Sequence, residues 1–259
     1  MPHPDDALPS AMNDPAPPPV AGAIAAVAPP PFAYTTTRVL PEIGRRLLQD
    51  PQVARGERTP LSEVFKMLRN QVTRRMALEG HKLLAITSPR AVDGKSHVAL
   101  NLALALAASY DTTVLLVDGD LSGRGLQHVL GLSGAAGLGE HLAGGAAIPG
   151  LLVNPGLARL VILPAGSRAM TDSAELLSTR AARELFVEMK SRYPDRLVIV
   201  DLPPALDTAD TLAFLPQADT TLVVVEEHGS RIADVEALAD LLAPFPLIGT
   251  VIDPRRAAR

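Results

Sequence analysis

The sequence predicts an α/β protein in which helices cover both faces of a mostly parallel sheet. Two observations carry this prediction: short runs of Val, Ile and Leu recur along the chain, and helical segments alternate with them from residue 60 onward. Strands that are apolar at every position need cover on both faces, and alternating helices supply it. We therefore expect a doubly wound sheet whose ligands bind beyond the carboxyl ends of its strands.

From Pro60 onward, predicted helices and strands alternate along the chain. The first is an amphipathic helix over Leu61–Gly80, whose apolar residues recur at helical spacing and which Gly80 ends. The second predicted helix, Lys95–Ser109, is apolar nearly all round and should be buried. The expected strands are Lys82–Thr87, Thr113–Asp118, Arg159–Leu163, Arg196–Asp201, Thr220–Val225 and Leu247–Ile252, and the remaining helices lie near Ala174–Arg192, Thr208–Leu215 and Ile232–Leu242.

Composition excludes several classes of function. The 259 residues carry a net charge of −4, so no broad nucleic-acid-binding surface is expected. Aromatic residues make up 3% and Trp is absent, which argues against base-stacking platforms. The lack of Cys excludes disulfides, thiolate chemistry and Cys-ligated metals. No apolar stretch is long enough for a membrane span, and the N-terminus lacks the charged start of a signal peptide, so we expect a soluble protein.

The chain is expected to divide into a tail and one domain. Residues 1–31 hold ten of the 24 prolines, a composition that favours an extended or disordered segment. Residues 32–58 are transitional in composition. The prediction is thus a proline-rich tail or linker over residues 1–58 and a single domain over residues 59–259. The tail is interpreted as a plain tether, with a docking arm for a partner as the alternative.

A phosphate-binding loop is predicted between the first strand and the second helix. Residues 88–96 follow a strand and open a helix, so backbone N–H groups and the helix N-terminus would face an anion. Lys95 would reach the β- and γ-phosphates, and the Ser96 hydroxyl would bind Mg²⁺. The strict G-x-x-x-x-G-K-[ST] pattern is not met, because Pro89 stands in place of its first Gly. A surface loop that ends in a helix cap remains the alternative on this motif alone.

Three aspartates follow two other predicted strands. Asp118 and Asp120 lie at the end of TVLLV, and Asp201 ends RLVIV. Two acids spaced by one residue suggest a metal-associated or general-base pair, and an acid like Asp201 is a common Mg²⁺ partner. Each aspartate alone is equally compatible with a helix cap or a turn. Together with the predicted phosphate loop, they indicate a nucleotide and Mg²⁺ site at one edge of the sheet.

Longer stretches strengthen this interpretation. They are SEVFKMLRNQV, ITSPRAVDGKSHVALNLALALA, TVLLVDGDLSGRGLQHVLGL, GLGEHLAG, LVILPAGS, SAELLSTR, YPDRLVIVDLPPALDTADTLAFLPQADTTLVVVEE and LIGTVID. From about Leu61 to Asp253, the chain resembles the bacterial tyrosine kinases (BY-kinases) of capsule and exopolysaccharide export. These belong to the deviant Walker class of P-loop ATPases. The SAELL, YPDR and LVVVEE runs are similar to the subgroup found beside exosortase-type exopolysaccharide loci, and the type is the stand-alone cytoplasmic one.

The resemblance implies a role for each matched position. The cofactor is ATP with Mg²⁺, held by residues at the Walker A end, which are Asp93, Gly94, Lys95, Ser96 and His97. The resemblance implies that Asp118 and Lys95 are catalytic. Asp118 matches the first acid of the family's second acidic motif, which activates the acceptor tyrosine hydroxyl. Ser96, Asp120 and Asp201 match the Mg²⁺ positions. A motif for ring assembly corresponds to Glu63, Lys66 and Arg69, where Lys replaces an Arg and loses its planar fork.

The departures from the family pattern are equally specific. Ala91, Val92 and Asp93 replace Pro-Gly-Glu, and a β-branched Val resists positive φ, so reduced nucleotide affinity is expected. Two cationic positions after the second acidic motif are missing. The C-terminal VIDPRRAAR holds no tyrosine cluster, which leaves Tyr34 as the expected self-acceptor.

The leading hypothesis is an ATP-dependent protein-tyrosine kinase or kinase-like regulator of exopolysaccharide synthesis and export. It would be cytoplasmic, recruited to the inner face of the plasma membrane by a chain-length-determinant or co-polymerase protein, and able to form a homo-oligomer. One alternative is a catalytically weak nucleotide-binding scaffold of the export complex. Another is a positioning ATPase of the partitioning type, although Arg90 stands where that class carries a second lysine.

Overall fold

The computed structural model describes residues 37–50, 52–54, 59–91, 94–192, 195–227 and 229–254. Three of the predicted features lie outside these ranges: the proline-rich segment over residues 1–31, the expected self-acceptor Tyr34 and the loop residue Asp93.

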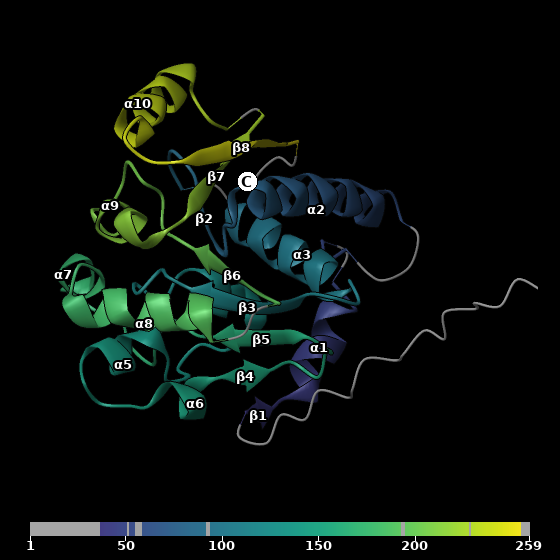
Figure 1. The fold of residues 1–259 in the computed structure, drawn as a ribbon, viewed down its shortest axis with the longest axis vertical. Helices are drawn as coiled ribbons and strands as arrows, with labels where there is room; N and C mark the ends of the chain where they lie inside the picture. The colour runs from purple at the N-terminus through teal and green to yellow at the C-terminus, as the bar shows by residue number, and fades with distance from the viewer. Residues whose placement is uncertain are drawn as a thin grey trace, which may run out of the picture. The chain divides into compact units, whose positions relative to one another are not determined.

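Within the described residues, eight strands form one sheet in the order β1-β4-β5-β3-β6-β2-β7-β8 (Figure 1). All neighbouring strands pair in parallel except β4 and β5, which are antiparallel. The predicted mostly parallel, doubly wound sheet is therefore confirmed. The strands are β1 (Arg38–Val39), β2 (Leu83–Thr87), β3 (Thr113–Asp118), β4 (Val153–Asn154), β5 (Leu160–Leu163), β6 (Arg196–Asp201), β7 (Thr220–Glu226) and β8 (Leu247–Asp253).

Helices cover both faces of this sheet (Figure 1), and each face has its own apolar cluster. Alternate side chains of each central strand enter opposite clusters: in β2, Ile86 joins one cluster and Ala85 the other. The first cluster includes helices α1 (Pro41–Leu47), α2 (Pro60–Glu79), α3 (Lys95–Ala107) and α4 (Leu126–Leu130). The second includes α5 (Leu138–Leu142), α6 (Ile148–Leu151), α7 (Ser173–Leu177), α8 (Arg180–Ser191), α9 (Asp210–Phe214) with the 3₁₀ turn η1 (Leu215–Gln217), and α10 (Ile232–Leu242).

Local signals define the ends of α2 as the sequence predicts. Thr59 caps the N-terminus: its side chain accepts from the Ser62 amide at 3.1 Å, and the Ser62 hydroxyl accepts from the Thr59 amide at 2.9 Å. Pro60 occupies the first helical position, where its missing N–H costs nothing. Gly80 ends the helix with φ of 69°, a left-handed conformation that glycine adopts readily.

The packed domain begins earlier than the boundary at residue 58 that composition predicts. Strand β1 pairs with β4, and helix α1 buries Ile43 and Leu47 in the first apolar cluster. Gly44 of α1 lies so close to the Pro155 carbonyl that a Cβ atom there would be 2.3 Å from its oxygen. Residues 38–47 are therefore part of the fold. Their polar composition hides this, because only two large apolar side chains of α1 face the core.

Two other expectations change in detail. The single helix predicted near Ala174–Arg192 is two helices, because Thr179 adopts an extended conformation and its side chain caps α8 by accepting from the Ala182 amide at 3.1 Å. The short helices α4, α5 and α6 were not predicted, since four or five residues carry too little periodicity. Among the described residues, no helix combines the length and apolarity that crossing a bilayer requires.

Candidate functional site

The sheet brings the predicted strand-end residues to one edge. Strands β3 and β6 pair in a register that sets Asp118 directly opposite Asp201. Strand β2 lies on the other side of β6, and its carboxyl end leads into the loop that precedes Lys95. The Gly119 amide donates to the Asp201 carbonyl at 2.8 Å, which ties the two acidic strand ends together. The three predicted segments thus meet at the place where parallel sheets bind ligands.

Lys95, Ser96 and Asp201 form a compact hydrogen-bonded group. Lys95 Nζ lies 2.6 Å from Asp201 Oδ1, and Ser96 Oγ donates to Asp201 Oδ2 at 2.6 Å. The side chain of Asp201 is fully buried and that of Lys95 is 6% exposed. A buried carboxylate needs a paired cation and further hydrogen bonds, and this group supplies both. The lysine and the hydroxyl that the sequence assigns to phosphate and Mg²⁺ are therefore held at the first turn of α3.

Asp118 lies beside this group, held by backbone amides. Its Oδ1 accepts from the Asp120 amide at 3.1 Å, and its Oδ2 accepts from the Gln127 amide at 2.6 Å. Burial, followed by the negative charge of Asp201, raises the pKa of Asp118 to about 8, although the two amide hydrogen bonds oppose the shift. The proton affinity of Asp118 is therefore raised by its surroundings, and a cation bound beside it would lower that affinity.

Asp120 and Asp210 add to the negative charge at this end of the sheet. Asp120 Oδ1 accepts from the Ser122 amide at 3.1 Å and from the Ser122 hydroxyl at 2.5 Å. On α9, burial raises the pKa of Asp210, and the charges of Asp120 and Glu175 contribute to the rise. Such a concentration of carboxyl groups favours a bound cation.

A cavity of about 570 Å³ opens over these residues. Its wall includes Lys95, Ser96, His97 and Asp120, together with Asp207 from the loop after β6. The remaining lining residues are Ala91, Ser122, Arg124, Gly125, His128, Val129, Pro203, Pro204 and Thr208. Four of the predicted site residues, Lys95, Ser96, His97 and Asp120, therefore face one space, while Asp201 lies buried beneath Lys95 and Ser96.

The residues present fit a Mg²⁺ ion that arrives with nucleotide. Among the described residues, no group of three or more His, Cys, Asp or Glu side chains is arranged to hold a metal alone. Mg²⁺ is usually bound by one or two carboxylates together with substrate phosphates and water. Ser96 and Asp201 already share a hydrogen bond, and Asp120 lines the same cavity. These three would supply the protein's share of the ligands.

Sequence reasoning missed the loop contacts at the rim of this cavity. Arg90 Nη1 lies 2.8 Å from Asp207 Oδ1, and Arg90 Nε lies 3.1 Å from Asp234 Oδ1 on α10. Asp207 Oδ2 also accepts from the Ala91 amide at 3.1 Å. Arg90 and Asp207 are 117 positions apart, so no local pattern reveals the pair.

Gln127 is a second residue without a sequence signal. It is buried at the start of α4, and while its amide holds Asp118, its side-chain Oε1 accepts from the Gly166 amide at 3.3 Å. Gln127 therefore connects the loop after β5 to the buried acid. Only the packing of α4 against the strand ends shows this role.

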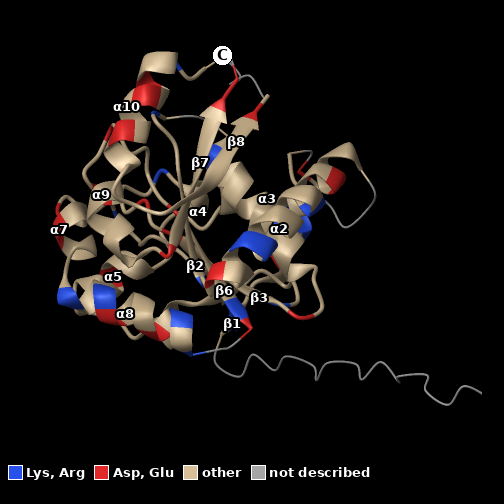
Figure 2. Ribbon diagram, turned by 45° about the horizontal axis from the view of Figure 1, so that its top comes forward, with Lys and Arg blue, Asp and Glu red and all other residues tan. Residues whose placement is uncertain are grey.

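The three residues matched to ring assembly lie along α2 and do not line the nucleotide cavity. Lys66 Nζ pairs with Glu63 Oε1 at 2.7 Å, and Arg69 Nη1 donates to the Ala105 carbonyl of α3 at 3.1 Å. Figure 2 shows the basic segments of this helix lying between an acidic segment near each end. Within the domain, the motif is thus engaged in its own contacts.

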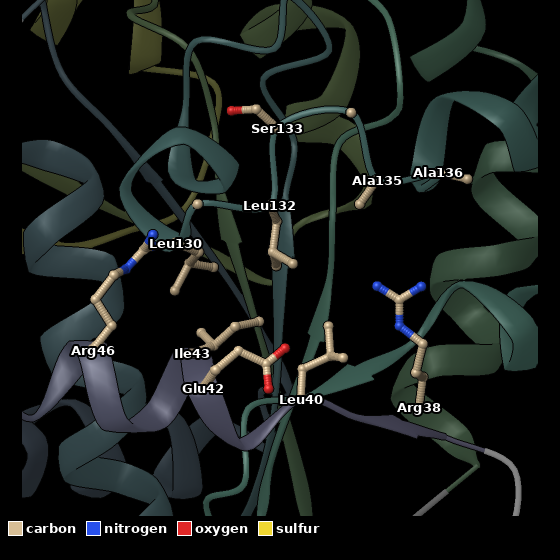
Figure 3. Close-up of a pocket in the computed structure, with 12 residues that line it drawn as sticks. Arg38, Leu40, Glu42, Ile43, Arg46, Leu130, Leu132, Ser133, Ala135 and Ala136 are labelled. Atoms are coloured by element: carbon tan, nitrogen blue, oxygen red, sulfur yellow. The ribbon is translucent and has the colours of Figure 1, made fainter.

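A second cavity, of about 600 Å³, lies between β1, α1 and the segment after α4 (Figure 3). Arg38 and Arg46 stand on opposite sides of it, with Glu42 between them. Arg46 Nη2 donates to the Val129 carbonyl in α4 at 2.9 Å. None of the predicted site residues lines this cavity, but Arg46 connects α1 to the helix whose amide holds Asp118.

Comparison with known proteins agrees with this geometry, although no protein-family model matches the chain. The succinoglycan biosynthesis transport protein ExoP of Rhizobium meliloti is 33% identical over 204 residues, which cover 77% of this chain and 25% of ExoP. The tyrosine-protein kinase wzc of Salmonella typhimurium is 29% identical over 193 residues, which cover 74% of this chain and 26% of wzc. The chain thus spans about a quarter of the length of these relatives.

Solved structures show the same fold. The kinase domain of the Escherichia coli tyrosine kinase ETK superposes with a TM-score of 0.68 at 26% identity, covering 88% of this chain and 93% of that domain. The septum site-determining protein MinD of Pyrococcus horikoshii, solved with Mg-ADP, superposes with a TM-score of 0.53 at 22% identity, covering 66% of this chain and 69% of MinD.

The parallel sheet, with a lysine, a hydroxyl and aspartates at its strand ends, defines a P-loop ATPase. Within that class, the chain belongs to the bacterial tyrosine kinase domain family, on the evidence of its similarity to wzc, to the ETK kinase domain and to part of ExoP.

Proposed function

We propose that this chain is an ATP-dependent protein-tyrosine kinase that phosphorylates itself or a partner and regulates exopolysaccharide or capsule export. One observation carries the proposal. The buried Lys95–Asp201–Ser96 group lies beside Asp118, and Lys95, Ser96 and Asp120 line a single cavity. Phosphoryl transfer needs positioned phosphates, a metal and a carboxylate near the attacking hydroxyl, and these residues supply the protein's part.

Each residue has a distinct task in this proposal. Lys95 binds phosphate oxygens and balances their charge, while its ion pair with Asp201 holds the ammonium at the base of the loop. Asp118 accepts the proton of the acceptor tyrosine hydroxyl. Ser96, Asp120 and Asp201 hold Mg²⁺, which when bound neutralises phosphate charge. Asp93, Gly94 and His97 complete the nucleotide contacts.

The protonation of Asp118 supports a regulated kinase. A base with a pKa of about 8 is mostly protonated at neutral pH, so it becomes effective when cations bind beside it. A metal held by Asp120 and Asp201 would favour the ionised carboxylate of Asp118. The nucleotide-free state is therefore expected to be inactive toward tyrosine.

A catalytically weak scaffold is the second candidate. Its support is Val92, a β-branched residue in a loop where the family carries glycine, together with the raised pKa of Asp118. In that case, bound ATP would set a conformational state and no tyrosine would be modified. A positioning ATPase has weaker support, because the loop carries Arg90 in place of a second lysine and Arg90 contacts Asp207 and Asp234 of its own domain.

The partner and setting follow from the same family. We place the chain at the cytoplasmic face of the plasma membrane, beside a chain-length-determinant or co-polymerase protein whose cytoplasmic tail completes the site. Similarity to a succinoglycan transport protein supports an exopolysaccharide pathway. An exosortase-linked locus and self-association through Glu63, Lys66 and Arg69 are further parts of the proposal.

A labelling assay tests the proposed kinase. The full chain is incubated with labelled ATP and Mg²⁺, with and without the cytoplasmic tail of the neighbouring co-polymerase. We expect phosphotyrosine, reduced by about 10²- to 10⁴-fold in Asp118→Asn. Asp240→Asn, which removes a carboxylate from an exposed position of α10, is the matched control and should leave labelling unchanged.

The other outcomes of this assay are equally informative. ATP binding without any phosphotyrosine would favour the scaffold. Lys95→Met should abolish nucleotide binding, and an unchanged affinity in that variant would contradict the assigned phosphate site.

A further inference from the structure

The rim of the phosphate loop already holds an anion of its own. The carboxylate of Asp207 bridges two donors of the loop: Oδ2 accepts from the Ala91 amide at 3.1 Å, and Oδ1 pairs with Arg90 at 2.8 Å. Backbone amides of such loops are the groups that bind nucleotide phosphates. Asp207 and Ala91 line the same cavity as Lys95 and Ser96. The Asp207 carboxylate thus accepts from a loop amide that a nucleotide phosphate could otherwise use.

The loop after β6 is held in this position by several independent contacts. Its backbone is joined to the phosphate loop by the Ala205 amide, which donates to the Ser88 carbonyl at 2.9 Å, and by the Leu206 amide, which donates to the Pro89 carbonyl at 3.2 Å. Neither bond involves the Asp207 side chain. The carboxylate can therefore leave the amide without separating the two loops.

Asp207 also differs from the other carboxylate of the site in its exposure. The side chain of Asp201 is fully buried against Lys95, whereas that of Asp207 is 33% exposed. When a partly exposed carboxylate gives up an ion pair, water solvates the charge and offsets most of the loss, whereas a buried carboxylate has no water to replace its partner. Arg90, the cation that holds Asp207, is 46% exposed and has a second carboxylate partner in Asp234.

From this geometry we infer that Asp207 is a built-in competitor of the nucleotide phosphates, and that its displacement from the Ala91 amide sets nucleotide affinity. Two anions cannot share one donor, and their mutual repulsion penalises the bound state. The inference depends on nucleotide binding at the proposed site and not on phosphoryl transfer. Asp207 would thus weaken nucleotide binding at a site where Lys95 and Ser96 are proposed to strengthen it.

The test compares variants of the full chain in equilibrium binding of Mg–ATP and of adenosine. Asp207→Asn keeps the shape and an acceptor oxygen but removes the charge. We expect it to bind Mg–ATP about two- to fivefold more tightly than the unmodified chain. Asp207→Ala should also bind more tightly, and adenosine affinity should not change, because adenosine has no phosphate. Asp240→Asn, which removes an equal charge from α10, should bind like the unmodified chain.

The opposite sign identifies a structural role. If Asp207 only supports the loop, Asp207→Ala would weaken Mg–ATP binding and Asp207→Asn would leave it unchanged or weaker, and either result would overturn the inference. That outcome leaves the proposed kinase intact, since the unmodified chain still binds ATP. If neither the unmodified chain nor Asp207→Asn binds Mg–ATP, both the inference and the proposed function fail. Asp207→Asn carries the test if Asp207→Ala does not fold.

Discussion

The two ends of the phosphate loop are built from the same kind of contact in opposite environments. At the inner end, Lys95 pairs with Asp201 at 2.6 Å and both side chains are nearly inaccessible to water. At the outer end, Arg90 pairs with Asp207 at 2.8 Å and both remain in partial contact with solvent. Water screens the outer pair and not the inner one.

The difference assigns separate tasks to the two pairs. Breaking a buried pair leaves a charge that the fold cannot solvate, so the inner pair is coupled to folding. Breaking the outer pair leaves two charges that water can solvate, so it can exchange partners with a ligand. The inner end is thus fixed by the fold, and the outer end is suited to exchange its contacts for those of a ligand.

The largest expected effect comes from breaking the inner pair. Lys95→Met leaves the buried carboxylate of Asp201 next to Asp118 without its cation, which should lower the free energy of unfolding by about 3–5 kcal/mol. Urea denaturation of the nucleotide-free protein measures this loss. Lys66→Met is the control, because it breaks a more exposed pair with Glu63 and should cost no more than about 1 kcal/mol. Equal losses in the two variants would show that burial does not govern these pairs.

The pH dependence of stability tests the buried acid at the inner end. The pKa of Asp118 is about 8 in the folded protein and close to 4 when unfolded, so the folded state holds the proton more tightly. Its stabilising contribution is complete below about pH 4 and is lost as the pH rises toward 8. Relative to Asp118→Asn, the unmodified chain should lose stability by up to about 1.4 kcal/mol per pH unit in this window.

Urea denaturation at a series of pH values, without metal, measures this slope. Asp240→Asn, which removes a carboxylate from an exposed position of α10, serves as the control. A flat difference for Asp118→Asn would mean that Asp118 titrates normally.

A steric change probes how tightly the inner acids are packed. A Cβ atom at Gly125 would lie 2.7 Å from Asp118 Oδ1 and 2.8 Å from Asp120 Cβ. Gly125→Ala should therefore lower the free energy of unfolding by about 1–3 kcal/mol, the usual cost of overpacking. Gly150→Ala on α6, where a Cβ meets nothing within 4 Å, is the matched control. Thermal unfolding compares the two, and equal midpoints would indicate a loosely packed site.

The smallest expected effect lies at the outer end. Asp234→Asn removes a carboxylate partner from Arg90 and from Arg231, whose side chain is 80% exposed. The urea midpoint should move only slightly, and the difference should shrink as NaCl rises from about 0.1 M to about 1 M. The Asp234 side chain is 12% exposed, but both arginines that hold it reach solvent, where salt screens their charges. The effect of Lys95→Met should persist across the same salt range. If the change in urea midpoint for Asp234→Asn persists at high salt, the contacts of Arg90 are not screened by water, and the contrast with the buried Lys95–Asp201 pair is wrong.

The regular elements were predictable where local composition is decisive. The expected bounds of β3, β6 and α10 agree with the structure to the residue, since apolar runs there end abruptly at charged or breaking residues. Strand β1 and helix α1 were not predicted, because their stability comes from Ile43 and Leu47 packing on distant segments. The short helices between β3 and β6 were missed for the same reason.

The site residues also fall into two groups: those that a sequence pattern predicts and those that only the folded structure reveals. Gly-Lys-Ser after a strand, and aspartates at two strand ends, identify Lys95, Ser96, Asp118, Asp120 and Asp201 without any coordinates. Gln127 and Asp207 carry no pattern of their own. Their importance depends on which amide each one reaches, and a folded chain alone determines that.

The sequence alone determined the strands, the helices that cover them and the chemical groups at the strand ends, because these depend on neighbouring side chains. The tertiary structure decided the register that sets Asp118 against Asp201, the burial that raises the pKa of Asp118, and the contact between Asp207 and the Ala91 amide. Electrostatic energies depend on distance and on exclusion of water, and both are properties of segments that meet only on folding.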